Sequence, residues 1–144
     1  MNKSLQDYLN SYDLDLCQNS GREIARPKAL VYDHTGIIMG INKYSKNLMV
    51  FHNHPNTGPA IVTIQEFMDG EQYYFTDNPH DAWNVVLIRS FRQVEAQNAY
   101  NVTYNCQHAS SFARKGEASS SGLKGTLAVA AIAILFGGFF GSQE

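Results

Sequence analysis

The sequence predicts an α+β domain, in which helices flank a small antiparallel sheet and a C-terminal hydrophobic tail follows. Three observations favour this class. Apolar residues recur at helical spacing over residues 5–12 and 85–94, and apolar, β-branched runs alternate with turn residues between them. Residues 126–140 carry no charge. With 144 residues, the chain is long enough for one domain with its own core.

The first predicted element is a short amphipathic helix over residues 5–12, because Ser4 and Asp7 have the spacing of a capping box. After a loop, residues 29–39 are apolar and β-branched and predict one strand or two short ones. Residues 48–51 are the returning strand of a hairpin. Residues 52–59 are expected to be a loop, since two prolines and a glycine interrupt any strand.

Two more strands are predicted over residues 60–64 and 72–75, with an Asp-Gly turn signal between them. From residue 81 the apolar spacing becomes helical and predicts a helix to about residue 97; a strand over residues 85–88 is the competing interpretation. Asn105 is a good N-cap residue, so the last helix of the domain is expected to begin at Cys106.

These elements divide the chain into four parts. They are an N-terminal extension with its helix (1–22), the domain itself (23–116), a small polar linker (117–125) and the hydrophobic tail (126–141). The tail is at the lower limit of the roughly 17–20 apolar residues that span a bilayer. A short tail anchor, an interfacial segment and a buried helix all remain open, and we expect a cytoplasmic protein that the tail associates with membranes.

Charge and cysteine content narrow the choice of partners. The net charge is −2 and no run of Lys or Arg occurs, which argues against RNA or DNA as the main partner. Cys17 and Cys106 are too few for a disulfide framework, so reduced thiols are expected, with a single bridge as the alternative.

Cys106 and His34 are the residues that predict chemistry. A thiol at a helix N-terminus lies at the positive end of the helix dipole, which lowers its pKa toward the reactive thiolate. His34, on a predicted strand, could take the thiol proton, and His52 could orient His34. The structural alternatives are a small buried cysteine and histidines that belong to the core.

Other polar residues near these positions have weaker signals. Gln107 could donate to an oxyanion, or be a solvated helix residue, and His108 is expected to be structural. We expect His54 to face away from His52. His52 and His54 could also be read as a metal pair, but no third ligand follows at ligand spacing, so no metal and no cofactor are expected.

Taken together, these segments resemble the lecithin:retinol acyltransferase-like (LRAT-like) family. Residues 23–27 (EIARP) resemble the strand that leads into the family's H-box, and residues 34–40 (HTGIIMG) are similar to the H-box, His-x-(Gly/Ala)-Ile-Tyr-x-Gly. Residues 50–52 (VFH) resemble the next strand. Residues 100–108 (YNVTYNCQH) are similar to the Asn-Cys box, in which Gln107 replaces the usual Glu.

The resemblance implies a permuted papain-like domain with Cys106 as acyl-accepting nucleophile, His34 as general base and His52 as its orienting partner. The implied reaction transfers an acyl chain from a phospholipid to Cys106 and then to water, an amine or an alcohol. The family also includes picornaviral 2A proteins of the H-box/NC type. The departures from the cellular pattern, which include Gln107, Ala109 and a longer loop over residues 41–47, favour that viral branch. The alternative function is therefore a non-catalytic viral protein that acts at membranes with host or viral replication proteins.

Overall fold

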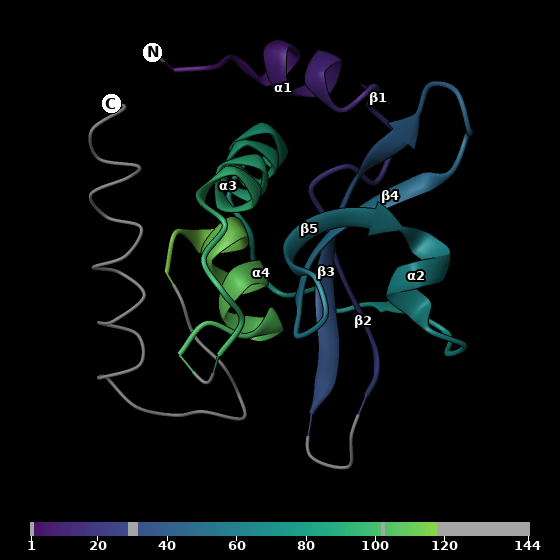
Figure 1. The fold of residues 1–144 in the computed structure, drawn as a ribbon, viewed down its shortest axis with the longest axis vertical. Helices are drawn as coiled ribbons and strands as arrows, with labels where there is room; N and C mark the ends of the chain where they lie inside the picture. Colours follow the sequence, from purple (N-terminus) through teal and green to yellow (C-terminus); the bar gives the residue numbers. More distant parts are fainter. Residues whose placement is uncertain (1, 29–31, 102, 118–144) are drawn as a thin grey trace.

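The computed structural model describes residues 2–28, 32–101 and 103–117, which form an α+β domain (Figure 1). The helices are α1 (Leu5–Ser11), α2 (Ile64–Met68), α3 (Trp83–Ala96) and α4 (Cys106–Lys115). The strands are β1 (Leu14–Asp15), β2 (Glu23–Pro27), β3 (Asp33–Asn42), β4 (Leu48–His54), β5 (Gly58–Thr63) and β6 (Tyr74–Phe75). The predicted fold class, helices with a small antiparallel sheet, is confirmed.

All strand pairs of the six-stranded sheet are antiparallel, in the order β5-β4-β3-β2-β6, and β1 pairs with the far end of β3. The central hairpin of β3 and β4 pairs Gly36 with His52 and Ile38 with Val50. Gly36 has no room for a side chain, because a Cβ there would lie 2.8 Å from the Phe51 carbonyl oxygen and from the Phe67 ring. The backbone beside His52 is therefore closely packed.

The two faces of the sheet have separate cores, since successive strand residues point to opposite faces. On one face, Ile37, Met39 and Phe51 pack with apolar residues of α1, α3 and α4. On the other, Ile38 and Val50 pack with residues of α2 and β5. In Figure 1 the pair α3 and α4 lies on one side of the sheet and α2 on the other.

Side-chain caps fix where the helices begin. Ser4 and Asp7 form the predicted capping box of α1. Asn105 caps α4, and its side-chain oxygen accepts hydrogen bonds from the backbone N–H groups of Gln107 and His108 at 3.0 and 3.1 Å. The predictions that helices begin after Ser4 and at Cys106 are confirmed.

The prediction of a loop over residues 52–59 is wrong at both ends of that range, where the structure has strands. β4 continues through His54, and β5 begins at Gly58, so that only a tight turn separates the two strands. Pro59 is tolerated because β5 is an edge strand, where a missing N–H can face away from the ladder. The short strand β1 and the helix α2 were not predicted.

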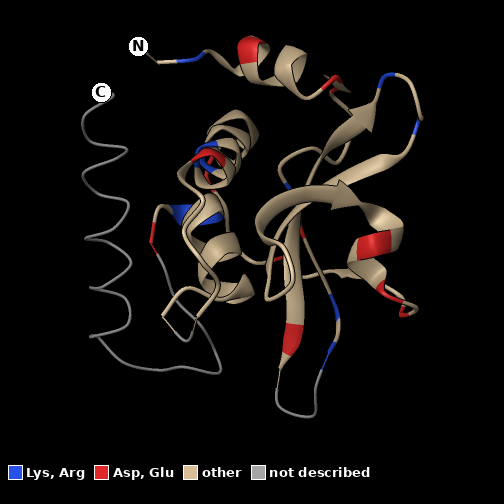
Figure 2. Cartoon of the chain, in the orientation of Figure 1, with Lys and Arg blue, Asp and Glu red and all other residues tan. Residues whose placement is uncertain are grey.

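Charged residues of both signs are distributed over several elements (Figure 2). The hydrophobic tail (126–141) and all but the first residue of the linker (117–125) lie outside the described residues. Among the residues that are described, no helix is both long and apolar enough to cross a membrane.

Candidate functional site

His34 and His52 form a buried pair on adjacent strands. Gly36 pairs with His52, and His34, two residues before Gly36 on β3, lies on the same face of the sheet. Nε2 of His34 is 2.8 Å from Nδ1 of His52, so these two nitrogens share one hydrogen. His34 is fully buried and His52 is 4% exposed. The two imidazoles are therefore fixed relative to one another by the register of the hairpin.

His54 belongs to the same cluster, so the expectation that it faces away from His52 is wrong. Its ring centroid lies 5.6 Å from that of His34 and 5.6 Å from that of His52. Residues two apart on a strand share a face, and β4 extends far enough to include all three residues of its His-Asn-His segment. Phe67 of α2 stacks on the His34 ring at 5.2 Å.

Both paired imidazoles are neutral at pH 7. Burial lowers the pKa of His34 and of His52 far below the ordinary value, and the positive charges of Arg26 and Lys28 lower it further. Each ring also has one nitrogen without a hydrogen-bond partner in the described part of the chain, Nδ1 of His34 and Nε2 of His52. Buried polar atoms without partners are rare, which marks this pair as a candidate functional site.

Cys106 lies at the first turn of α4, close to the strand residue that follows His34. The hydroxyl of Thr35 donates to the carbonyl oxygen of Cys106 at 3.1 Å and is 2.7 Å from the hydroxyl of Ser110. Thr35 therefore faces α4, whereas His34 faces α2 and Phe67. No hydrogen bond joins the Cys106 sulfur to an imidazole among the described residues.

The environment of the Cys106 thiol favours its neutral form. The residue is fully buried, and burial raises the pKa of the thiol above its usual value. Backbone N–H groups of Thr35 and Gln107 and the charge of Lys28 act in the opposite direction. The expectation that the helix N-terminus lowers this pKa is wrong for the net effect, because desolvation outweighs the dipole and its hydrogen bonds.

The two residues after Cys106 have separate structural contacts. The side-chain amide of Gln107 donates to the carbonyl oxygen of Asp33 at 3.3 Å, so an oxyanion would have to compete with that contact. His108 is buried, and its Nδ1 accepts from the backbone N–H of Asn105 at 3.2 Å as part of the α4 capping box. This contact gives His108 the structural role that its position predicted.

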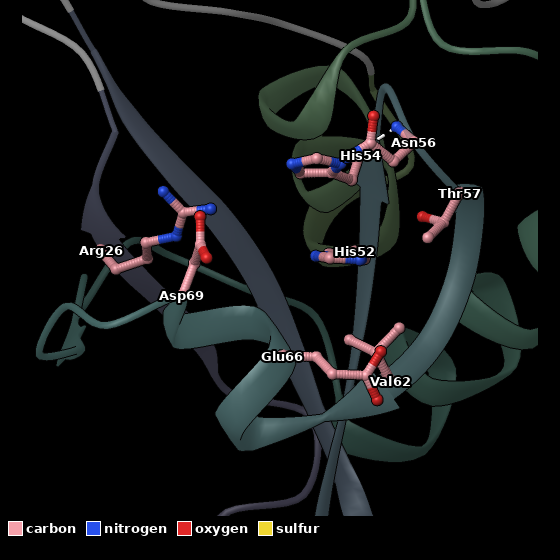
Figure 3. Close-up of a pocket in the computed structure, with 8 residues that line it drawn as sticks. All are labelled: Arg26, His52, His54, Asn56, Thr57, Val62, Glu66 and Asp69. Carbon is pink, nitrogen blue, oxygen red and sulfur yellow. Dashed lines mark hydrogen bonds between the residues drawn. The ribbon is translucent and has the colours of Figure 1, made fainter.

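Two cavities adjoin the site from opposite faces of the sheet. One, of about 290 Å³, reaches the histidines (Figure 3) and is lined by Arg26, His52, His54, Asn56, Thr57, Val62, Glu66 and Asp69. The other, of about 370 Å³, reaches the neighbours of Cys106 and is lined by Glu23, Thr35, Asn78, Pro79, Gln107, Ser110, Ser111 and Arg114. The imidazoles and the residues around the thiol thus adjoin different cavities, and Cys106 itself lines neither of the two.

No protein-family model matches the sequence, and a search of curated proteins finds no match. Within the described residues, no group of three or more His, Cys, Asp or Glu side chains is arranged to hold a metal ion. The resemblance to the LRAT-like family therefore stays a prediction from the motifs quoted above.

Proposed function

We propose that this chain is an LRAT-like H-box/NC protein, built as a permuted papain-like domain, that transfers acyl groups through Cys106. The observation that carries the proposal is the 2.8 Å contact between Nε2 of His34 and Nδ1 of His52. It supports a base held by an orienting partner, because a thiol nucleophile needs a base that is itself fixed in one tautomer. The capped start of α4 next to Thr35 supports Cys106 as the nucleophile.

The proposed roles of His34 as base and His52 as orienting partner fix the tautomer of each imidazole. If Nε2 of His34 donates its hydrogen to Nδ1 of His52, Nδ1 of His34 is the free acceptor. The reaction requires the Cys106 sulfur and Nδ1 of His34 to come together from the two faces of β3. The proton then passes to that nitrogen while the sulfur attacks the carbonyl carbon of a phospholipid ester. The ester C–O bond breaks, His34 returns the proton to the leaving alcohol, and a thioester remains on Cys106. Water, an amine or an alcohol then attacks the thioester and restores the thiol.

The proposed site of action is the cytoplasmic surface of a membrane, with phospholipid as the acyl donor and the hydrophobic tail as the attachment. Removing residues 127–140 should then move the protein from the membrane fraction to the soluble fraction. An unchanged distribution would exclude the tail as the attachment. No metal or cofactor enters the scheme.

The second candidate is a non-catalytic viral protein of the same family that binds host or viral replication proteins at membranes, with RNA unsuited as a main partner by charge. The observation that favours it is the complete burial of Cys106, whose sulfur makes no hydrogen bond to an imidazole in the described part of the chain. An enzyme needs the thiol to meet both the substrate and its base.

Intact mass measured after incubation with phosphatidylcholine vesicles separates the two candidates. Acyl transfer predicts a mass gain of one acyl chain on the natural protein and on Cys17→Ala, no gain on Cys106→Ala, and loss of the gain in hydroxylamine, which cleaves thioesters. If no adduct forms on any variant while all three remain folded, the non-catalytic candidate stands.

A further inference from the structure

The cavity beside His52 and His54 has the features of an anion-binding site. Figure 3 shows both imidazoles extending from β4 toward the side of the cavity where Arg26 and Asp69 lie. Arg26 stands on β2, paired with His34 of β3, so that the guanidinium and the histidines come from three adjacent strands. A volume of about 290 Å³ leaves room for a small polar group among them.

Arg26 is a buried cation without an anionic partner. Its side chain is 5% exposed. Nε donates to the carbonyl oxygen of Phe67 at 2.8 Å and Nη1 to that of Pro27 at 3.2 Å. In the part of the chain that the structure describes, no carboxylate lies within ion-pair distance of this guanidinium, and Nη2 has no hydrogen-bond partner. Nη2 is therefore the donor that the guanidinium has left for an anion in the cavity.

The histidines offer two further donors. Nδ1 of His54 accepts from the backbone N–H of Asn56 at 3.0 Å, which puts the hydrogen of the neutral ring on Nε2. When Nδ1 of His52 accepts from His34, the hydrogen of His52 is likewise on Nε2, the buried atom without a partner. Neutral imidazole N–H groups and a guanidinium are suitable donors for phosphate oxygens.

The charges that face these histidines are of both signs. Arg26 and Lys28 of the β2 segment act as cations on His52 and His54, whose pKa values they lower in addition to the effect of burial. On α2, Glu66 uses its carboxylate to cap the helix at Thr63. The Asp69 carboxylate has no hydrogen bond or ion pair among the described residues, and its charge opposes the net lowering of the pKa of His54 by burial and the cations. Asp69 and Glu66, which both line the cavity, are the groups that oppose an anion.

We propose that this cavity binds a phosphate group, with Arg26 Nη2 and the Nε2–H groups of His52 and His54 as donors. The phosphate could belong to a free phosphate compound or to a phospholipid headgroup, which share this chemistry. The inference needs no thiol chemistry and holds for either candidate function. A bound phosphate would keep the hydrogen of His52 on Nε2, and therefore leave Nδ1 of His34 as an acceptor.

Two binding measurements on the full chain test this proposal. Binding to inorganic phosphate is measured by ³¹P line broadening at constant ionic strength. Binding to phosphatidylcholine vesicles is compared with binding to vesicles of a phosphate-free glycolipid. Arg26→Lys and His54→Gln should each weaken phosphate binding by about tenfold, since Lys lacks the planar guanidinium fork and the Gln amide replaces a fixed imidazole N–H with a flexible donor. Asp69→Asn should strengthen it several-fold. Asn suits this position because residue 69 has φ 49°, a left-handed conformation that Asn tolerates.

Arg22→Gln is the matched control, because Arg22 lies outside this cavity and pairs with Asp77 at the surface; it should leave phosphate binding unchanged. If the three cavity variants change binding to inorganic phosphate as expected, the ligand is a free phosphate compound. If they change binding to phosphatidylcholine vesicles alone, the ligand is a phospholipid headgroup. The proposal is overturned if the natural protein does not bind inorganic phosphate and binds phosphatidylcholine vesicles no more strongly than glycolipid vesicles. It is also overturned if Arg26→Lys, His54→Gln and Asp69→Asn remain folded and bind as strongly as the natural protein.

Discussion

The carboxylate of Glu23 accepts a hydrogen bond from Nε of Arg114 at 3.0 Å, and this ion pair joins β2 to the last turn of α4. Their side chains are 3% and 12% exposed, respectively. The same carboxylate accepts from Thr76 and Asn78. Three segments that are distant in sequence therefore meet at one buried anion, beside the cavity that reaches the neighbours of Cys106.

Glu23→Gln should lower the free energy of unfolding by about 3 kcal/mol, because it leaves the Arg114 guanidinium without its buried partner. Urea denaturation measures this change. Asp77→Asn is the control, since it breaks the exposed Arg22–Asp77 pair and should cost at most about 1 kcal/mol. If Glu23→Gln and Asp77→Asn lower the free energy of unfolding equally, burial of the Glu23–Arg114 pair is not what makes it stabilising.

Asn105→Ala should destabilise the protein by about 1–2 kcal/mol, because it removes the acceptor for two N–H groups at the start of α4. Asn105→Asp keeps an acceptor at the cap and should retain most of the stability. Thermal unfolding of the two variants gives the comparison. If Asn105→Asp is as unstable as Asn105→Ala, the cap is not what holds this helix start.

Stability should fall in mild acid because of the buried histidines. The pKa values of His34 and His52 are lowered in the folded state, so below about pH 6.5 the unfolded chain binds protons that the folded chain does not. Each imidazole then lowers the free energy of unfolding by roughly 1.4 kcal/mol per pH unit as pH falls below that value.

Urea denaturation between pH 7.5 and 4.5 tests this slope. His52→Gln should remove a large part of it. His80→Gln, at an exposed histidine outside the cluster, should leave it unchanged. A His52→Gln protein with the full natural slope would show that the paired imidazoles do not titrate on unfolding.

Cys106 should react with iodoacetamide more than tenfold more slowly than Cys17 in the folded protein at pH 7.5. Cys106 is fully buried and burial raises the pKa of its thiol, whereas Cys17 is partly exposed. Peptide mass spectrometry of timed samples gives both rates, and in urea the two should become similar. Faster labelling of Cys106 would mean that its thiol is accessible and activated, as the acyl-transfer candidate requires, whereas slow labelling favours the non-catalytic candidate.

The elements with local signals could be predicted from the sequence. The caps at Ser4 and Asn105 are side-chain patterns within four residues, and both helix starts agree with them. Thr63 and Glu66 carry the same capping-box pattern, and this local signal is enough to predict the start of α2. The extension of β4 to His54 depends instead on pairing with β5, including Pro59 at the sheet edge, and no local rule indicates that.

Some features of the candidate site could likewise be predicted from local sequence, and others depend on the whole fold. The alternation of strand residues was enough to group His54 with His52, had the strand been continued. The contact between His34 and His52 depends on the register of β3 against β4, which the sequence alone does not reveal. The burial of Cys106 depends on how closely α4 packs against Thr35. Desolvation then outweighs the helix dipole, which is a property of the whole fold.

The pairing of β3 with β4 ends at Gly36 and His52, one residue short of Thr35. In backbone pairing the first residues of β3 have β2 as their only strand partner among the described residues, through the pairs of Ala25 with Thr35 and Arg26 with His34, and the contact of His34 with His52 joins them to β4 through side chains. This end of β3 therefore separates the two halves of the proposed site, with the start of α4 and Cys106 on one face and the imidazoles on the other. Its position sets the distance between the Cys106 sulfur and the His34 imidazole.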